Sequence, residues 1–586
     1  MSIPEAKDTT VYFNGVDVVR GEYGLSPISG PSLAEKVRGE AAPDNLVDLK
    51  ARRQRDAGGP EAIAALNREL AAAEAELAAA TDPARAAVLL QAVERLRSKL
   101  ANLQHLGVKE GIDATDLAQA GWGVIFAADA DPELKAALAP LLRRRAAQAG
   151  ARYREFEREK GHRGAKDSKT RFVERNGGPR SGPVDPDRIP YYLLIVGGPA
   201  AIPYSFQYQL DVQYAVGRLH FDTLDEYANY AQNVVAAETR GNPRPRRLDF
   251  FAVENPDDRA TRLSATMLVD PLRAALTRDN GERGWGWTID PNRHADTRRA
   301  ALARLLGGGP DTPALLFTAS HGVELPPDHP RLSAHQGALL CSDWPGPLGP
   351  RGPVPEEFYL AGEHLDRSAD LTGLMVFAFA CYAAGTPEFD EFSRLGRVGA
   401  PPSRRAPAPF VSGLARSLLG RPRGALAMIG HVERAWGCSF VHSTPGGGTL
   451  DNTEMFRSAL ARILNGSPVG HAFEYFNERH AEVATVLVDQ LDQSDRGQVV
   501  EWQALVRLWL ENNDARNYVV LGDPAVRLRF TADPSLAAPV LDPGARSSPG
   551  SPAPERPAGI SEADWLATPA AVRELLVRMR AQLDGR

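Results

Sequence analysis

Cysteine, long hydrophobic runs and net positive charge are all scarce in this chain of 586 residues. The three cysteines, Cys341, Cys381 and Cys438, are too few and odd in number for a disulfide framework, and they form no C-x-x-C pair for zinc, so a reducing, cytoplasmic location is favoured. No stretch of about 18 apolar residues could cross a bilayer, and the N-terminal residues lack the pattern of a secretory signal. With 68 Lys and Arg against 74 Asp and Glu, the net charge is −6, so neither a nucleic acid nor a membrane is an expected partner.

Motifs for common cofactors are also missing. No G-x-x-x-x-G-K-[ST] phosphate loop occurs, so ATP hydrolysis is not expected. A metal cluster of His321, His329, His335 and Cys341 is disfavoured, because prolines separate these residues and no short ligand pair is present. The sequence therefore predicts a protein without a cofactor or a metal.

Short apolar runs that end at turn residues, with helical stretches between them, dominate from about residue 110. Near-continuous apolar strands are typical of a parallel sheet covered on both faces. The pattern predicts an α/β fold with a largely parallel sheet, and the expected strands cover residues 123–126, 191–196, 248–253, 314–318, 374–380 and 425–429. Helices are expected over 410–419 and 451–464, and an exposed loop over 152–189.

Five regions follow from changes in composition. Heptad-like leucine spacing predicts a helical hairpin in an N-terminal region, 1–109. An α/β subdomain, 110–245, precedes a catalytic subdomain, 246–530. A Ser- and Pro-rich linker, 531–560, leads to an amphipathic C-terminal helix, 561–586. The hairpin and the last helix either pack on their own domain or bind an adaptor or sensor protein.

Two strand ends carry residues suited to nucleophilic catalysis. The run 315–320 leads into His321 and Gly322, and the run 375–380 leads into Cys381. Sites in open parallel sheets lie beyond the carboxyl ends of the strands. A thiolate there could attack a carbonyl while imidazole transfers protons, with the amides of Gly322 and Cys381 as oxyanion donors. The alternative is a cysteine that only packs in the core.

A set of short segments occurs in a fixed order between about residues 190 and 530. They are Tyr192–Pro199 with Ile202 and Pro203, Tyr214–Leu219, Phe250–Asn255, His321–Gly322, Ala380–Tyr382 and Tyr518–Leu528. In this order they resemble the gingipain-like group of caspase-fold cysteine peptidases. The resemblance implies a three-layer α/β/α fold and a catalytic pair of His321 and Cys381. It also implies an orienting carboxylate, which matches Glu254.

The resemblance implies a substrate preference as well. The gingipain-like branch cleaves after a basic residue, whose side chain needs a buried acid. Asp257, Asp258 and Glu433 are the candidates, and Trp436 lies in the same loop as Glu433. The alternative for these acids is a solvated surface position. The Arg-rich segment 393–409 is expected to be an exposed loop. If the enzyme cuts after arginine, this loop is a candidate for self-cleavage, and the alternative is an inert surface loop.

The resulting hypothesis is an intracellular cysteine endopeptidase that acts on a protein or peptide substrate, with Arg or Lys before the cleaved bond. Its N- and C-terminal helices are similar in architecture to those of bacterial caspase-like proteases of immune or cell-death systems. The alternative is a catalytically silent caspase-fold scaffold that binds protein partners.

Overall fold

A computed structural model describes residues 12–25, 72, 76, 89, 107–164, 167–291, 293, 295–390, 403–443, 449–451, 453–495 and 502–530. The chain divides into two compact units, 1–533 and 534–586, and every described residue belongs to the first. The predicted C-terminal helix lies outside the described residues, as does nearly all of the predicted hairpin. The five predicted region boundaries stay predictions.

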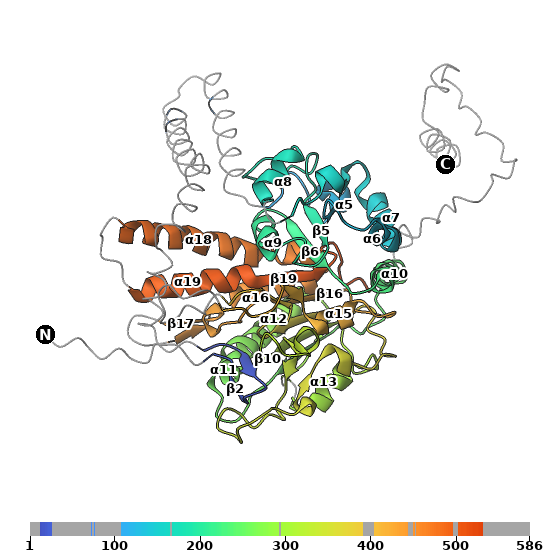
Figure 1. The fold of residues 1–586 in the computed structure, drawn as a ribbon. Coiled ribbons are helices and arrows are strands. Elements are labelled where there is room, and N and C mark those ends of the chain that lie inside the picture. Colours follow the sequence, from blue (N-terminus) through green and yellow to red (C-terminus); the bar gives the residue numbers. More distant parts are fainter. Residues whose placement is uncertain are drawn as a thin grey trace, which may run out of the picture. The chain divides into compact units, whose positions relative to one another are not determined.

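A ten-stranded sheet forms the centre of the described fold, and helices flank it (Figure 1). Its order is β4 (Tyr153–Phe156), β3 (Trp122–Phe126), β5 (Tyr192–Val196), β6 (Ala215–Leu219), β19 (Tyr518–Gly522), β16 (Ala427–His431), β13 (Met375–Phe379), β9 (Leu315–Ala319), β7 (Arg247–Ala252) and β8 (Thr288–Ile289). Every neighbouring pair is parallel except β16 with β19. The prediction of an α/β fold with a largely parallel sheet is therefore confirmed.

The central strands are apolar along their whole length because helices cover both faces. All residues of β3, β5, β9, β13 and β16 are buried. The α-helices with bounds among the described residues are α5 (Leu117–Ala120), α6 (Pro132–Ala137), α7 (Ala139–Ala149), α8 (Lys169–Arg175), α9 (Tyr204–Asp211), α10 (Leu224–Arg240), α11 (Arg259–Leu263), α12 (Asp270–Arg283), α13 (Arg299–Leu305), α14 (Leu332–His335), α15 (Gly413–Leu419), α16 (Glu454–Leu464), α17 (Val469–Ala472), α18 (Glu474–Asp495) and α19 (Trp502–Asn517).

A second, five-stranded sheet contains the N-terminal segment. Its order is β12 (Tyr359–Leu360), β11 (Leu339–Leu340), β10 (His321–Glu324), β1 (Gly15–Asp17) and β2 (Glu22–Tyr23). Strand β1 pairs in parallel with β10, about 300 residues later in the chain. Two further pairs, β14 (Gly385–Thr386) with β15 (Phe410–Val411) and β17 (Val441–Ser443) with β18 (Thr449–Asp451), complete the strands.

The expectation of an exposed loop over 152–189 is wrong in part. Strand β4 adds to the sheet edge beside β3, and α8 buries Phe172 and Val173. The sequence of this stretch is mostly charged, and its apolar segments are short because an edge strand buries few side chains. The hydrophobic pattern is therefore too weak to predict a strand. The segment 393–409 is also not uniformly exposed, since Arg405 is half-buried against Asp390 and Glu324. Residues 391–402 of it lie outside the described residues.

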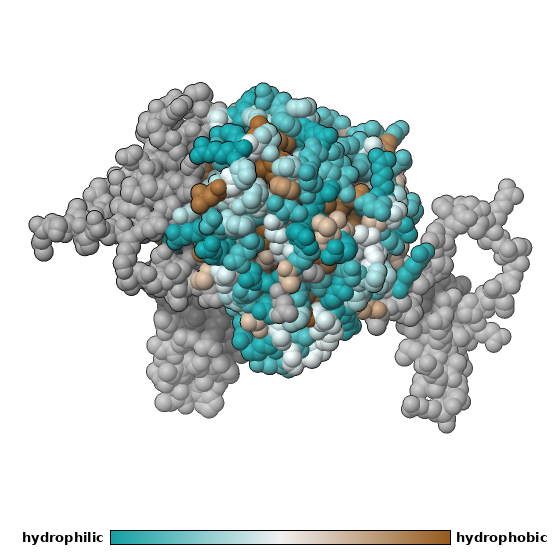
Figure 2. Space-filling view, turned by 90° about the horizontal axis from the view of Figure 1, so that it is seen from below, coloured by the Kyte–Doolittle hydropathy of each residue, from teal (hydrophilic) through white to brown (hydrophobic). Residues whose placement is uncertain are grey.

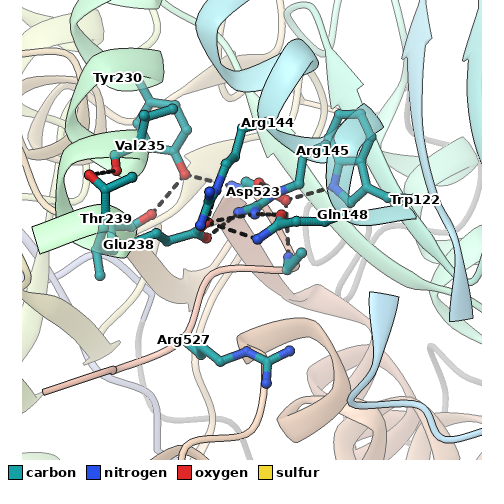
Figure 3. A network of polar contacts seen from close by, with 12 residues as sticks. Trp122, Arg144, Arg145, Gln148, Tyr230, Val235, Glu238, Thr239, Asp523 and Arg527 are labelled. Atoms are coloured by element: carbon teal, nitrogen blue, oxygen red, sulfur yellow. Dashed lines mark hydrogen bonds and ion pairs between the residues drawn. The ribbon is translucent and has the colours of Figure 1, made fainter. Parts of the chain in front are cut away.

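A buried polar network joins the two halves of the sheet near its antiparallel junction (Figure 3). Asp523, directly after β19, accepts hydrogen bonds from Trp122 Nε1 at 2.9 Å and Arg145 Nε at 2.6 Å. Arg145 also donates to Glu238 on α10 at 2.7 Å. Tyr230 Oη accepts from the Asp523 amide and donates to the Leu426 carbonyl just before β16. One carboxylate thus connects β3, α7 and β19.

The face of the molecule drawn in Figure 2 is mainly hydrophilic, and its hydrophobic residues lie in small separate groups. The exposed large hydrophobic side chains among the described residues are Val19, Leu348, Phe389 and Val486.

Asp523→Ala should lower the free energy of unfolding by about 3–5 kcal/mol, because it leaves the buried Arg145 short of a partner and Trp122 Nε1 without an acceptor. Urea titration followed by far-UV circular dichroism measures the loss. Asp187→Ala is the matched control, since its pair with Arg152 is exposed and its removal should leave the midpoint unchanged. Equal midpoints for the two variants would contradict a structural role for Asp523.

Candidate active site

His321 and Cys381 follow two neighbouring strands that end in register. Ala319 at the end of β9 pairs with Phe379 at the end of β13, and the Ser320 amide continues the pairing to the Phe379 carbonyl at 3.2 Å. His321 and Cys381 come two residues beyond that pair. Both are fully buried. The expectation that parallel strands bring these two residues to one sheet edge agrees with this geometry.

The imidazole of His321 is held on several sides. Its Nε2 lies 2.6 Å from Asp258 Oδ2. The rings of Tyr23 and Trp344 each lie 5.7 Å from the imidazole, centroid to centroid. The remaining nitrogen, Nδ1, is buried and has no hydrogen-bond partner among the residues that the structure describes. Nδ1 is therefore the ring atom available for proton transfer.

Asp258 is anchored before α11 as its N-cap. It accepts hydrogen bonds from the Ala260 amide at 3.0 Å, from Thr261 Oγ1 at 2.8 Å and from Tyr23 Oη at 2.6 Å. Burial opposes its ionisation, but the positive charge on His321 and these hydrogen bonds outweigh burial and lower the pKa of Asp258 to about 2. The carboxylate therefore stays ionised above that pH and can fix the orientation of the imidazole.

The thiol of Cys381 is enclosed in the described structure. The Ala435 amide donates to Sγ at 3.2 Å. Burial, with a contribution from the nearby Glu324 carboxylate, raises the pKa of the Cys381 thiol well above its usual value. The next residue, Tyr382, has a left-handed backbone with φ of 58°, a conformation that costs energy in a non-glycine residue.

The N-terminal segment, residues 12–17, fills the space beside this thiol. The carbonyl oxygen of Asn14 accepts hydrogen bonds from the amides of both Gly322, at 2.8 Å, and Cys381, at 3.1 Å. Gly322 has no room for a side chain, because a Cβ would lie 1.9 Å from the Cys381 carbonyl oxygen. The two amides that the sequence predicts as oxyanion donors thus converge on one carbonyl oxygen.

Residues before Asn14 run antiparallel to the loop that follows β16. Phe13 forms an antiparallel bridge with Trp436. The Asn14 amide donates to the Ala435 carbonyl at 3.1 Å, and the Gly437 amide donates to the Tyr12 carbonyl at 3.2 Å. A peptide bound in a cleft by strand addition makes this pattern of backbone hydrogen bonds.

The remaining residues that the sequence predicts for the site do not lie against the His321 imidazole. Glu254 is not brought to His321: it is exposed, pairs with Arg293 at 3.2 Å, and lines a separate polar pocket of about 600 Å³. Asp257 is exposed. Glu433 is buried beside Arg434 at 3.3 Å and Tyr382 Oη at 3.2 Å. Trp436 contacts the N-terminal segment, with its ring 5.4 Å from that of Phe13.

The carboxylate that lies against His321 is therefore Asp258, whereas the sequence suggested Glu254. The Glu254 side chain pairs with Arg293, and the N-cap position before α11 brings Asp258 to the imidazole. Asn14, Tyr23 and Ser264 at this site were missed by the sequence analysis. The apolar residues around Asn14-Gly15 in 11–19 are the signal that could have pointed to a strand.

Within the described part of the chain, a cluster away from His321 has the composition of a metal site. His335, Glu356, Glu363 and His364 each place a ligand-type atom within 4.8 Å of the others. Arg331 Nη1, however, bonds both carboxylates, at 2.6 Å and 3.2 Å. The guanidinium supplies the positive charge that a metal would supply, so the cluster is satisfied as an ion-pair network.

Among the described residues, every helix is too short or too polar to cross a membrane. No family model matches the chain, and no curated protein matches it. In a comparison with solved structures, the chain is distantly similar to one described as "Structure of Protease", with a TM-score of 0.40 and 12% identity over 71% of this chain and 81% of that chain. A likeness this distant does not indicate a function. The function therefore has to be inferred from the geometry of the site.

Gly15→Val should expose Cys381. A Cβ at residue 15 would lie 2.4 Å from Glu324 Oε1 and 3.1 Å from Cys381 Sγ, so we expect the added side chain to push the segment away from the thiol. Because burial raises the pKa of the thiol, we expect slow alkylation by iodoacetamide at pH 7.5 in the wild-type chain and about 10-fold faster alkylation in the variant.

Peptide mapping by mass spectrometry measures this rate. Cys341, which is also buried with a raised pKa, serves as the internal reference and should not change. Gly309→Val is the matched control, because its added Cβ meets nothing within 4 Å. Equal rates in all three chains would contradict the enclosure of Cys381 by the N-terminal segment.

Proposed function

We propose that the chain is a cysteine endopeptidase. Cys381 is the nucleophile, His321 is the general base and acid, and Asp258 positions His321. The amides of Gly322 and Cys381 are the oxyanion donors. One observation supports the proposal most strongly. The Asn14 carbonyl oxygen accepts hydrogen bonds from the amides of Gly322 and Cys381, beside the Cys381 side chain, as the carbonyl oxygen of a substrate would.

Each residue has a defined step in this reaction. His321 Nδ1 takes the thiol proton, and Sγ attacks the peptide carbonyl. The two amides stabilise the negative charge that develops on the carbonyl oxygen. Imidazolium then gives its proton to the leaving amine, and water hydrolyses the thioester. Asp258, whose pKa is lowered, stabilises the imidazolium throughout.

The proposed specificity for Arg or Lys loses its support in this geometry. A basic side chain needs a free buried acid. Asp258 is bonded to His321, Glu433 lies beside Arg434, and Asp257 is exposed. Binding of an adaptor through the N-terminal hairpin or the C-terminal helix, and a place in an immune or cell-death system, stay predictions.

Cys381→Ala and His321→Ala should each abolish cleavage of a proteome-derived peptide library, and the double variant should lose no more than either single one. Both substitutions should be made in the wild-type chain and in the Gly15→Val chain, where peptides meet an open cleft. Cleavage products are identified by mass spectrometry.

A library that neither the wild-type nor the Gly15→Val chain cleaves would overturn the peptidase and favour a silent scaffold. Activity kept by Cys381→Ala would also overturn the proposal, because the cleavage would then not depend on this thiol. Cleavage that depends on both residues supports the proposal.

Asp258→Asn should lower kcat by about 10²–10⁴-fold with little change in KM, because the imidazole loses its orienting charge. Glu254→Gln should have a far smaller effect. Asp258→Glu should restore part of the activity, which a purely structural role would not predict. Urea midpoints verify that all three variants fold. A larger loss in Glu254→Gln than in Asp258→Asn would assign the positioning role to Glu254.

A further inference from the structure

The side chain of Asn14 lies in a small, enclosed polar recess. Asn14 is 1% exposed, and its Nδ2 donates to Ser264 Oγ at 3.2 Å and to the Ser320 carbonyl at 3.3 Å. Because a carbonyl can only accept, the atom that faces Ser320 must be a donor. Ser264 Oγ donates its own proton to the Thr261 carbonyl at 3.0 Å, so it also acts as an acceptor toward Asn14.

The recess therefore selects an uncharged side chain that ends in NH₂. Aspartate would place a carboxylate oxygen against the Ser320 carbonyl without a proton to share, at a cost of about 1–3 kcal/mol or more for the unpaired groups. Arginine or lysine would bury a charge against two neutral acceptors, since Asp258 nearby is already bonded to His321. Asparagine satisfies both acceptors without a charge.

Tyr12, Phe13 and Gly15, which flank Asn14, also make specific contacts with residues of the cleft. Phe13 lies against the Trp436 ring at 5.4 Å and below the Arg434 guanidinium at 5.7 Å. The Tyr12 ring lies 5.0 Å from the guanidinium of Arg259. Gly15 lies next to the Cys381 thiol, at a position where a Cβ would clash with the side chains of Glu324 and Cys381. The sequence Tyr-Phe-Asn-Gly is thus matched to the cleft at each position.

We propose that the site cleaves peptides after asparagine, and that its first substrate is its own Asn14–Gly15 bond. The proposal rests on the proposed peptidase function and names its specificity. Residues 12–14 occupy the positions of a substrate before the cleaved bond, and Gly15 occupies the first position after it.

The self-cleavage balances with water as the co-reactant. A bond forms between Cys381 Sγ and the Asn14 carbonyl carbon, and the bond from that carbon to the Gly15 nitrogen breaks. The proton of the thiol passes through His321 to the Gly15 amine. Water then hydrolyses the thioester, which leaves a carboxylate on Asn14 and restores the thiol.

Cleavage at this bond would open the cleft without removing support from His321. Residues from Gly15 onward keep their pairing of β1 with β10, and Tyr23 keeps its hydrogen bond to Asp258. The peptide that ends at Asn14 is held by the recess, the aromatic contacts and a few backbone hydrogen bonds. It can then exchange for other asparagine-containing peptides.

Incubation of the purified full-length chain, followed by intact mass and N-terminal sequencing, tests the self-cleavage. We expect a new N-terminus at Gly15, formed at a rate that does not depend on protein concentration. Asn–Gly bonds also react spontaneously, so Cys381→Ala measures the background. Asn14→Asp, which keeps the size but removes the NH₂ donor, should slow the reaction at least about 10-fold. An equal rate in Cys381→Ala, or no new N-terminus, would overturn self-cleavage at this bond.

Fluorogenic peptides Tyr-Phe-Asn, Tyr-Phe-Asp and Tyr-Phe-Arg test the specificity in the Gly15→Val chain. The Asn peptide should have a kcat/KM about 100-fold above the other two. Ser264→Ala should lower kcat/KM for it about 10-fold by removing one acceptor, whereas the surface variant Ser368→Ala should not change it. Preferred cleavage of the Arg or Asp peptide would overturn the asparagine specificity and leave the peptidase intact. Failure of all three peptides, together with an uncleaved library, would overturn the peptidase itself.

Discussion

The register of two parallel strands is the constraint on which the rest of the site depends. Because β9 and β13 pair residue for residue up to Ala319 and Phe379, the chain leaves both strands at the same level of the sheet. The amides of Gly322 and Cys381 then point to one carbonyl oxygen. Only glycine at 322 permits this approach, since a Cβ would overlap the Cys381 carbonyl. Two fully buried strands thus position two donors that loops alone would hold less well.

Around that pair of amides, charge and burial act in opposite directions. Asp258 is buried yet ionised, because three hydrogen bonds and the imidazole compensate for the lost water. Cys381 is also buried, but the hydrogen bond from the Ala435 amide compensates only in part, so burial raises the pKa of its thiol. Residues 12–25 contribute to both effects: Tyr23 donates a hydrogen bond to Asp258, and Gly15 covers the thiol. Access to the cleft and the state of the nucleophile are therefore coupled through residues 12–25.

Much of the fold could be predicted from the sequence, because buried parallel strands are apolar runs and their ends are marked by turns. His321 and Cys381 could be found in the same way. The pairing of β1 with β10 could not, since no local pattern encodes a contact between residues about 300 positions apart. The choice between Glu254 and Asp258 depends on the turn of a few residues before α11, which directs one carboxylate to Arg293 and the other to His321. Strand β4 was missed because a short edge strand among charged residues carries little hydrophobic signal.

The most direct test of the account uses an acyloxymethyl ketone built on Tyr-Phe-Asn, which alkylates a thiolate only when it is held beside a peptide cleft. In the Gly15→Val chain, mass spectrometry should find one adduct, on Cys381, and no adduct after His321→Ala. The account would be contradicted if Cys381 stayed unmodified, or if Cys341 and Cys438 were modified at the same rate as Cys381.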